Sequence, residues 1–344
     1  MQAHPLVGAP MRVWQLDGPG NGRLQLAQRA IPAPGAHELL VRVDAVALNY
    51  RDKLMLENGL GETPERPFIP CSDMAGEVVA IGAGVTRFRP GARIVSTFFA
   101  GWVDGAYGGQ AALGGAHQTG MLAEYVVLNQ EWAASAPATL TAAQASTLPC
   151  AGLTAWQALI ELDGGLHAGD RVLIAGSGGV ALFGLQFARA HGAEVFLISA
   201  SEEKRARASA LGAAHGIARE ADWAHAVMEH SAGQGVDIVL ETAGGASLGR
   251  SLATLAQGGR IALIGLLDGS ELRTSVFPLL LRRATLQGVS VGPRCALERM
   301  IRAIDLNGIV PVIDREYAFE QAAEAFAHLD RGPFGKVVLR VGQD

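Results

Sequence analysis

A glycine-rich loop between an apolar run and a helical stretch constrains the fold of this chain more than any other feature. Residues 171–175 (RVLIA) are typical of a buried strand, and residues 176–181 (GSGGVA) satisfy the pattern G-x-G-x-x-A. Apolar residues at helical spacing then predict a helix up to His191, and residues 194–199 are typical of a second strand. This order of strand, loop, helix and strand predicts a dinucleotide-binding unit.

The small residues of this loop have separate roles. Gly176 makes the tight turn, Gly178 lets the backbone approach a pyrophosphate, and Ala181 is small enough for the helix to pack on the strand. The N-terminus of the helix offers free N–H groups to the anion. The residues that we expect to contact the cofactor here are Gly176, Ser177, Gly178, Gly179 and Val180.

The end of the second strand indicates which cofactor binds. NAD-binding sites usually place Asp or Glu there, where it binds the ribose 2′-hydroxyl group. This chain has Ser199 and Ser201 instead, followed by Lys204 and Arg205. Small hydroxyl groups leave room for a 2′-phosphate, and the cations can pair with it. We therefore predict NADP(H) as the cofactor, with a solvated basic turn as the alternative.

The pattern of elements changes along the chain. From Met11 to about Glu131, short runs rich in Val, Ile and aromatic residues alternate with Gly and Pro clusters, which predicts a compact β-barrel-like domain. Apolar strands then alternate with helices, which predicts an α/β fold with a doubly wound parallel sheet. From Val310 the chain reads strand, helix, strand, and this tail need not belong to the α/β unit.

Composition excludes several classes of protein. The 344 residues include 28 Lys+Arg against 33 Asp+Glu, so nucleic-acid binding has no electrostatic support. Apolar runs fall far short of the ~20 residues of a membrane span, and no signal-peptide pattern is visible. Three widely separated cysteines indicate a reducing compartment. We expect a cytoplasmic protein that binds neither nucleic acid nor membrane.

A hydrolase is a rival interpretation of the same loop. Residues 175–179 (AGSGG) differ by one residue from the nucleophile elbow G-x-S-x-G, with Ser177 in place of the nucleophile. A hydrolase would also need an acid and then a histidine downstream. Among the later histidines only His328 lies near the end of the chain, so we disfavour this interpretation.

Five segments, in this order, carry a family resemblance: VRVDAVALNYRDKLM, PCSDMAGEVVAIGAGVTRFRPGARI, LPCAGLTAWQAL, VLIAGSGGVALFGLQFA and FGKVVL. With them the chain resembles the medium-chain dehydrogenase/reductase superfamily over nearly its full length. More narrowly, it is similar to the zinc-free quinone-oxidoreductase branch and to zinc-type alcohol dehydrogenase-like proteins. The resemblance implies a GroES-like catalytic domain (11–132), an inserted Rossmann domain (133–292), a return to the catalytic domain (293–344), and a cofactor in the cleft between them.

The resemblance also allows the catalytic zinc to be tested. Zinc-dependent relatives have three ligands, Cys, His and Cys, and the matching positions here are Asn49, Ser72 and Cys150. A catalytic zinc normally keeps three protein ligands, and only one thiol remains. We therefore expect no metal.

Several site residues are implied by the resemblance alone. Tyr50, beside the first ligand position, is the candidate proton donor, with simple packing as the alternative. Asn49 is its catalytic neighbour, and Asp73 orients the second ligand loop. The nicotinamide side is implied to include Asn49, Thr154, Gly265, Leu266, Phe334, Gly335 and Lys336, and the adenosine side Ala243 and Gly244.

These residues favour one reaction class. Without zinc an alkoxide is not easily stabilised, whereas quinones and α,β-unsaturated carbonyl compounds spread the charge that arrives with a hydride. We predict reduction of such an electron-poor substrate by NADPH. An alcohol or aldehyde dehydrogenase of the same fold and a non-catalytic NADPH-binding protein remain alternatives. The apolar strand at residues 285–292 is expected at a sheet edge, and with the family it predicts a homodimer.

Overall fold

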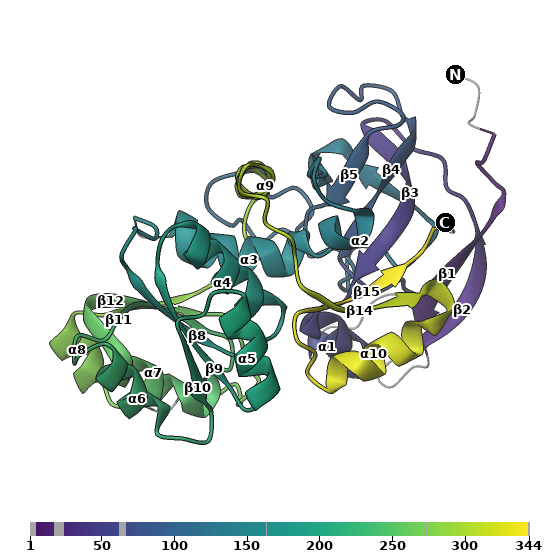
Figure 1. Ribbon diagram of the computed structural model, residues 1–344. Coiled ribbons are helices and arrows are strands. Elements are labelled where there is room, and N and C mark those ends of the chain that lie inside the picture. Colours follow the sequence, from purple (N-terminus) through teal and green to yellow (C-terminus); the bar gives the residue numbers. More distant parts are fainter. Residues whose placement is uncertain (1–4, 17–23, 62–66, 163, 273, 343–344) are drawn as a thin grey trace. The chain divides into compact units, whose positions relative to one another are not determined.

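The structure is a computed structural model that describes residues 5–16, 24–61, 67–162, 164–272 and 274–342. The chain divides into two compact units (Figure 1). Unit 1 comprises Met1–Leu153 and Gly292–Asp344, and unit 2 comprises Thr154–Val291. The sequence places residues 133–153 with the dinucleotide-binding domain, whereas in the structure they pack within unit 1.

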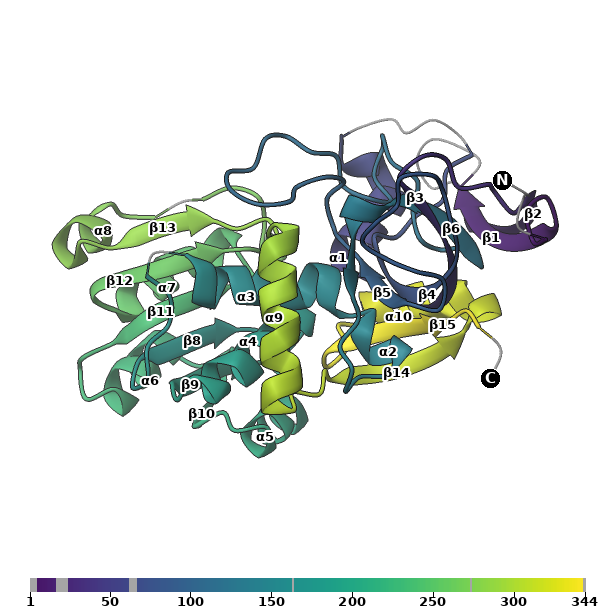
Figure 2. The same cartoon turned by 90° about the horizontal axis from the view of Figure 1, so that it is seen from above.

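Unit 2 contains a six-stranded parallel sheet in the order β10-β9-β8-β11-β12-β13. Figure 2 shows β13 and β10 at its two edges. From β8 the chain adds β9 and β10 on one side of the sheet. It then crosses back and adds β11, β12 and β13 on the other side, which is the doubly wound order. The strands are β8 (Arg171–Ala175), β9 (Glu194–Ser199), β10 (His215–Ala218), β11 (Val236–Glu241), β12 (Leu255–Leu263) and β13 (Thr285–Gly288).

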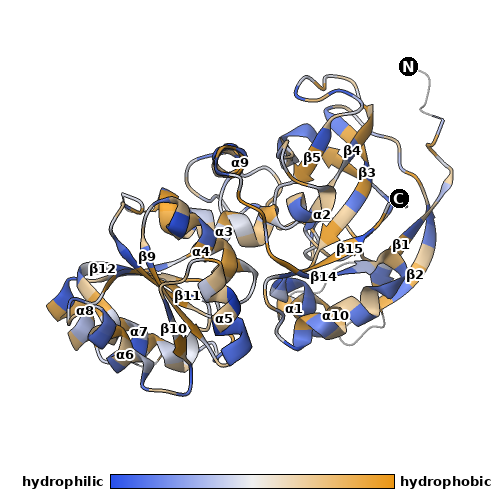
Figure 3. Cartoon of the chain, in the orientation of Figure 1, coloured by the Kyte–Doolittle hydropathy of each residue, from blue (hydrophilic) through white to orange (hydrophobic). Residues whose placement is uncertain are grey.

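Helices cover both faces of this sheet. Figure 1 shows α4 and α5 on one face and α6, α7 and α8 on the other. The middle parts of β8 and β9 are runs of buried apolar residues, as expected of strands covered on both faces (Figure 3). The helices are α3 (Leu153–Trp156), α4 (Gly179–Ala190), α5 (Glu202–Ala210), α6 (Trp223–His230), α7 (Leu248–Thr254) and α8 (Phe277–Arg282). The α/β fold class predicted from the sequence is confirmed.

Unit 1 is built around a seven-stranded sheet whose central strand, β3, has partners on both sides. One side pairs with β4, and the other pairs with β6 near the start of β3 and with β15 near its end. A separate pair, β1 and β2, packs beside it. The strands are β1 (Pro10–Leu16), β2 (Leu24–Ala30), β3 (Glu38–Ala47), β4 (Asp73–Ile81), β5 (Arg93–Ser96), β6 (Tyr125–Asn129), β7 (Ala133–Ser135), β14 (Ile313–Ala318) and β15 (Lys336–Arg340).

The helices of unit 1 come from separate parts of the described chain. They are α1 (Tyr50–Asn58), α2 (Ala142–Ala145), α9 (Arg294–Asn307) and α10 (Ala322–Asp330). After α2 the chain makes a wide helical turn, Leu148–Gly152, before α3 begins. Among the residues that the structure describes, no helix is both long and apolar enough to cross a membrane.

The Gly-rich segment 99–120 is held against unit 1 by its own aromatic residues and by backbone contacts. Phe99 lies 5.7 Å from Trp102 and 4.9 Å from Tyr107 between ring centroids, and Leu113 is buried. A Cβ atom on Gly120 would lie 2.1 Å from the carbonyl oxygen of Pro70, so the two backbones touch there. The glycines of this segment therefore permit close packing.

Candidate active site

The glycine loop of unit 2 has the geometry that the sequence predicts. Gly176 has a φ of +129°, which favours glycine, and it follows β8 directly. Gly178 is the N-cap of α4, and a Cβ atom placed on it would meet no other atom within 4 Å. The first N–H groups of α4, from Gly179 and Val180 onward, thus face open space that an anion can occupy.

Two further predicted segments end at the same edge of the sheet. Ala243 and Gly244 follow β11, and both of their N–H groups donate to Oε1 of the buried Glu241 at 3.0 Å. Gly265 follows β12, and a Cβ atom on it would lie 1.6 Å from the carbonyl oxygen of Thr242, so only glycine fits there. Because β8 and β11 are neighbours at the point where the strand order reverses, these loops surround the expected dinucleotide position.

The C-terminal end of β9 contains the residues that we expect to select the cofactor. Ser199 is buried, and its Oγ atom lies 3.4 Å from Oγ of Ser177. The Oγ atom of Ser201 accepts a hydrogen bond from the backbone N–H of Lys204, so Ser201 caps α5. Nη1 of Arg205 donates to the carbonyl oxygens of Ser199 at 2.8 Å and Ala200 at 3.0 Å. This guanidinium group is thereby fixed beside the strand end.

The remaining predicted residues of unit 2 and Tyr50 of unit 1 lie in different surroundings. Thr154 is buried in α3, whereas Leu266 is half exposed. Tyr50 begins α1 with 40% of its surface exposed, and its ring lies 5.7 Å from Nζ of Lys53. The Tyr50 hydroxyl group makes no hydrogen bond to any residue described, so its role as proton donor stays a prediction.

Unit 1 buries four polar residues together, Asn49, Asp52, Asp73 and Lys336, which we call the polar cluster. Nζ of Lys336 donates to Oδ1 of Asn49 at 2.5 Å and to the carbonyl oxygen of Leu48 at 2.6 Å. The backbone N–H of Asn49 donates to Oδ2 of Asp52 at 2.8 Å. The contact between Lys336 and Asn49 follows from the pairing of strands, because β15 begins with Lys336 and runs antiparallel to the end of β3, just before Asn49.

Asp73 links the second and third predicted ligand positions. Its Oδ1 atom accepts from the Ser72 hydroxyl group at 2.6 Å, and its Oδ2 atom accepts from the backbone N–H of Cys150 at 2.9 Å. Ser96 donates to the carbonyl oxygen of Ser72 and holds the same loop. Asn49, Ser72 and Cys150 are therefore all arranged around the polar cluster.

Burial controls the charges in the polar cluster. It raises the pKa of Asp73 to about 6, and the Lys336 ammonium and the Ser72 hydroxyl group act in the opposite direction. Burial also raises the pKa of Asp52, against the opposing effect of Arg51, whose Nη1 lies 3.2 Å from Oδ1 of Asp52. The pKa of the Cys150 thiol is likewise raised by burial and by the nearby Asp73 carboxylate.

The residues at the implied zinc positions do not fit that metal. Oδ1 of Asn49 is bonded to an ammonium ion and the Ser72 hydroxyl group donates to Asp73, so of the three positions only Cys150 offers a ligand type that zinc prefers. Within the described ranges, no group of three or more His, Cys, Asp or Glu side chains is placed to hold a metal ion. We therefore derive no chemistry through zinc.

Phe334 and Lys336, at the start of β15, are both buried. Phe334 is 2% exposed and Lys336 is 4% exposed. Gly335 has a φ of +98°, and a Cβ atom on it would lie 2.4 Å from the carbonyl oxygen of Val312. Nζ of Lys336 contacts the carbonyl oxygen of Leu48 and Oδ1 of Asn49, and its predicted contact with the cofactor stays a prediction.

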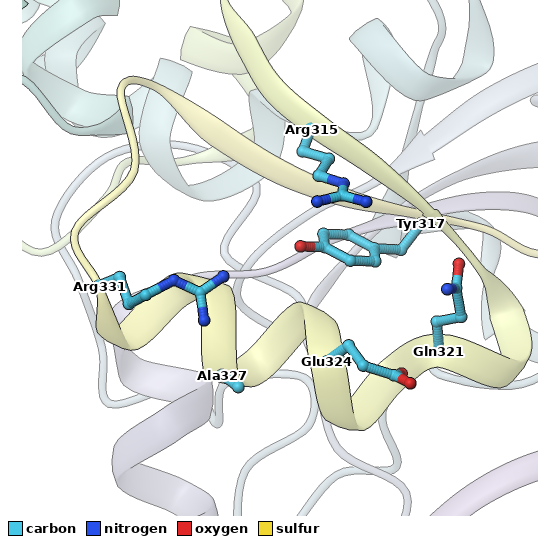
Figure 4. Close-up of a pocket in the computed structure, with 6 residues that line it drawn as sticks. All are labelled: Arg315, Tyr317, Gln321, Glu324, Ala327 and Arg331. Atoms are coloured by element: carbon cyan, nitrogen blue, oxygen red, sulfur yellow. The ribbon is translucent and has the colours of Figure 1, made fainter.

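A pocket of about 280 Å³ lies elsewhere in unit 1, between β14 and α10 (Figure 4). The Arg315 guanidinium group lies 4.8 Å from the ring centre of Tyr317, whose hydroxyl group is 3.1 Å from Nδ1 of His328. The lining residues are Arg315, Tyr317, Gln321, Glu324, Ala327 and Arg331, and none of them is a predicted site residue.

Sequence reasoning missed the residues that support the site. Glu241, Thr242, Ser96 and Arg51 are not among the predicted site residues, and the roles of Thr242, Ser96 and Arg51 depend on partners 24 or more residues away in the sequence. Arg51, for example, donates to the carbonyl oxygens of Leu113 and Gly114. Only the pairing of buried strands could have indicated these contacts.

The comparisons with known proteins agree with both units. Residues 35–138 match the family described as alcohol dehydrogenase GroES-like domain, and residues 179–306 match the family described as zinc-binding dehydrogenase. A zinc-type alcohol dehydrogenase-like protein of Schizosaccharomyces pombe is 36% identical over 88% of this chain and 91% of its own length. The quinone oxidoreductase of Rattus norvegicus is 29% identical over 96% of each chain.

Solved structures match along almost the whole chain. A protein from Sinorhizobium meliloti 1021, described as a candidate alcohol dehydrogenase, is 52% identical with a TM-score of 0.94, over 99% of this chain and 100% of its own. An NAD-dependent alcohol dehydrogenase is 31% identical with a TM-score of 0.90, over 96% and 100%. A 2-octenoyl-CoA carboxylase reductase in complex with NADP and 2-octenoyl-CoA is 25% identical with a TM-score of 0.86, over 96% and 87%. The chain therefore belongs to the medium-chain dehydrogenase/reductase superfamily of oxidoreductases.

Proposed function

We propose that this protein transfers a hydride from NADPH to a quinone or to an α,β-unsaturated carbonyl compound, without zinc. The observation that carries the proposal is the polar cluster, in which the position of the first zinc ligand, Asn49, binds the Lys336 ammonium group. A simple alcohol needs a Lewis acid to stabilise its alkoxide, and these residues do not supply one. A conjugated acceptor spreads the negative charge over its own atoms.

The residues of unit 2 fit a dinucleotide. The open space above Gly178, the N-terminus of α4 and the loops after β11 and β12 would hold the pyrophosphate and its neighbours. When bound, the nicotinamide ring supplies the hydride, and the protein orients the reactants and excludes water.

The end of β9 favours a 2′-phosphate. Ser199 stands where NAD-binding sites usually have an acid, which would repel a phosphate. Only Nη1 of Arg205 is bonded to the backbone, so its Nε and Nη2 atoms keep donors for an anion. The similarity to a reductase that binds NADP supports the same choice, and the similarity to an NAD-dependent enzyme makes it necessary to compare both cofactors.

The substrate class has support from two relatives. The rat protein is a quinone oxidoreductase, and the 2-octenoyl-CoA reductase binds a thioester whose double bond is conjugated with its carbonyl group. Quinones and conjugated thioesters are both electron-poor acceptors of the kind proposed here.

We also propose a homodimer formed through the β13 edge of unit 2. β13 is the last strand of the sheet, and the helix before it exposes apolar side chains. Phe277 is 68% exposed and Leu281 is 72% exposed, with Val276 and Leu280 beside them. A second copy of this chain would cover both the free strand edge and this apolar surface.

We further propose a cytoplasmic location. Cys71, Cys150 and Cys295 are all free in the structure, as expected of a protein kept in a reducing compartment.

The experiment that tests the function follows NADPH and NADH oxidation at 340 nm with 1,4-benzoquinone, 2-cyclohexenone and an aldehyde, each with and without a chelator. We expect chelator-insensitive turnover of the quinone or the enone, with NADPH preferred. Chelator-sensitive turnover restricted to the aldehyde would instead identify an alcohol dehydrogenase. Tight binding of NADPH with no turnover would identify a non-catalytic binding protein.

A further inference from the structure

The side-chain oxygen of Asn49 has a partner outside its own helix. An N-cap asparagine normally turns this oxygen toward the N–H groups of the helix that it begins. Asn49 and Asp52 form a capping box at the start of α1, and the backbone N–H of Asp52 also donates to the main-chain oxygen of Asn49 at 2.9 Å. Its side-chain oxygen accepts from Nζ of Lys336.

The lysine therefore decides which way the Asn49 amide group points. An ammonium group has donors only, so the oxygen of the amide must face it and the NH₂ group must face away. If the amide were turned over, two donors would meet inside the protein. Lys336 is 4% exposed, and the carbonyl oxygen of Leu48 fixes its Nζ atom from a second direction.

The NH₂ group of Asn49 is a buried donor without a hydrogen-bond partner in the part of the chain that the structure describes. The amide group helps to lower the pKa of Asp73, so that carboxylate is near, although the geometry falls short of a hydrogen bond. Asn49 itself is 6% exposed. Buried donors without partners are rare in folded proteins, and a functional site is a recognised reason for one.

The charge on Lys336 also acts on the other buried groups nearby. It lowers the pKa values of Asp52, Asp73 and Cys150, against the effect of burial.

We propose that Lys336 is a positioning residue, whose ammonium group holds the Asn49 amide so that its NH₂ group donates to an acceptor oxygen of the bound substrate or cofactor. The inference rests on the proposed function. The oxygen is either the carbonyl oxygen of the electron-poor acceptor, on which charge develops as the hydride arrives, or a ribose or carboxamide oxygen of NADPH. Lys336 touches neither and acts through Asn49.

Steady-state kinetics of the full-length protein test the coupling between the two residues. Lys336→Met removes the charge, Lys336→Arg keeps it, and Arg340→Met is the matched control, a cation exchanged on the exposed end of the same strand. If the donor serves the acceptor, Lys336→Met should lower kcat by about 30-fold or more and leave the Kd of NADPH within about threefold. If it serves the cofactor, the Kd of NADPH should rise instead.

The double variant separates positioning from independent effects. Asn49→Ala combined with Lys336→Met should be no worse than Asn49→Ala alone, within about twofold, because the lysine acts only through the amide. Lys336→Arg should recover activity relative to Lys336→Met. Losses that multiply in the double variant would overturn the proposal, as would wild-type kinetics in Lys336→Met.

A spectroscopic measurement on the wild-type protein is independent of turnover and of variant stability. The chain has five asparagines, so labelling asparagine with ¹⁵N at Nδ2 gives five NH₂ signals, and Asn49→Ala assigns the relevant one. Addition of NADPH moves this signal if the cofactor is the partner. Addition of 2-cyclohexenone to the NADP⁺ complex, which cannot react, moves it if the acceptor is the partner.

The outcomes distinguish this proposal from the proposed function. If the wild-type protein reduces no acceptor but its Asn49 signal moves with NADPH, the proposed function fails and the role of Lys336 stands. If neither ligand moves the signal, the amide serves only Asp73, and the proposal is wrong even in an active enzyme.

Discussion

Oδ2 of Asp73 accepts a hydrogen bond from the backbone N–H of Cys150 at 2.9 Å and so joins the start of β4 to a turn 77 residues later in the chain. The carboxyl group is fully buried, and burial raises its pKa from 3.8 to about 6. The free energy of unfolding therefore depends on whether Asp73 is protonated.

Asp73 should make the protein less stable as the pH rises. Because its folded-state pKa lies above its unfolded-state value, its contribution is fully present below about pH 4 and is lost as the pH rises through about 6. A shift of about two pKa units corresponds to roughly 3 kcal/mol at most. Asp73→Asn should remove this component, so its free energy of unfolding should fall less steeply from pH 4.5 to 7, as measured by urea unfolding.

Asp305 provides a control of opposite sign. Burial raises its pKa, but hydrogen bonds from Thr139 and Ala138 outweigh that effect and lower it overall. Its contribution is present above its unfolded-state pKa and is lost as the pH falls. Asp305→Asn should therefore change the pH dependence in the opposite direction and only below about pH 4, and should leave the slope between pH 4.5 and 7 as in the wild type. Parallel curves for Asp73→Asn and the wild type would contradict the assignment to Asp73.

Gly178→Ala should separate cofactor binding from folding. Its φ of −83° suits any residue, and a Cβ atom there would meet nothing within 4 Å, so the melting temperature should stay within about 2 °C. The added methyl group enters the space proposed for the pyrophosphate, and the affinity for NADPH should fall about tenfold or more by fluorescence titration. An unchanged affinity would mean that the phosphates bind elsewhere.

Gly265→Ala is the contrasting variant in the same unit. Its Cβ atom would lie 1.6 Å from the carbonyl oxygen of Thr242, so the loops after β11 and β12 would have to separate. We expect a large loss of soluble folded protein, measured by expression and thermal unfolding.

Ser199→Asp should reverse the cofactor preference. A carboxylate at this position repels a 2′-phosphate and can bind a 2′-hydroxyl group, so the ratio of kcat/KM for NADPH to that for NADH should fall by about 100-fold or more. Arg205→Ala should weaken the binding of NADPH and leave the binding of NADH unchanged. Arg207→Ala, on the same helix α5 but paired with Glu203, is the matched control and should leave the ratio unchanged. A wild-type protein that prefers NADH would already rule out this assignment.

The apolar surface of α8 should be required for dimer formation. Phe277→Asp combined with Leu281→Asp should convert the protein to monomers at micromolar concentration, because a charged group would be buried against the second copy. Light scattering after size-exclusion chromatography measures the mass directly. Leu306→Asp, an equally exposed leucine on α9, should leave the dimer intact. A wild-type protein that runs as a monomer would disprove the proposed dimer itself.

The sequence predicts unit 2 closely because its signals are local. The strands Arg171–Ala175 and Glu194–Ser199 begin and end where the pattern of apolar residues places them, and the loop between them contains its own glycines. In unit 1 the strand Leu24–Ala30 goes unnoticed, because its residues alternate between exposed and half-buried surroundings and include few β-branched side chains.

The candidate site is predicted in part. Asn49, Ser72, Asp73 and Cys150 follow from the family resemblance, and the structure brings them together. The burial of Lys336 could not be predicted, because it depends on β15 pairing with β3 across 287 positions of sequence. From the sequence alone, a lysine beside a glycine is expected to be exposed, and only the strand pairing shows that it is buried.

The pairing of β15 with β3 sets an order of events during protein synthesis. β3 leaves the ribosome early with its far end unpaired, and β15 is translated only after all of unit 2. Unit 2 is continuous in sequence and can fold while translation proceeds, whereas unit 1 must keep an open sheet edge until the last part of the chain arrives. The nascent chain thus keeps the edge of β3 at residues 45–47 unpaired for most of its synthesis, and unpaired strand edges are the kind of site that chaperones protect.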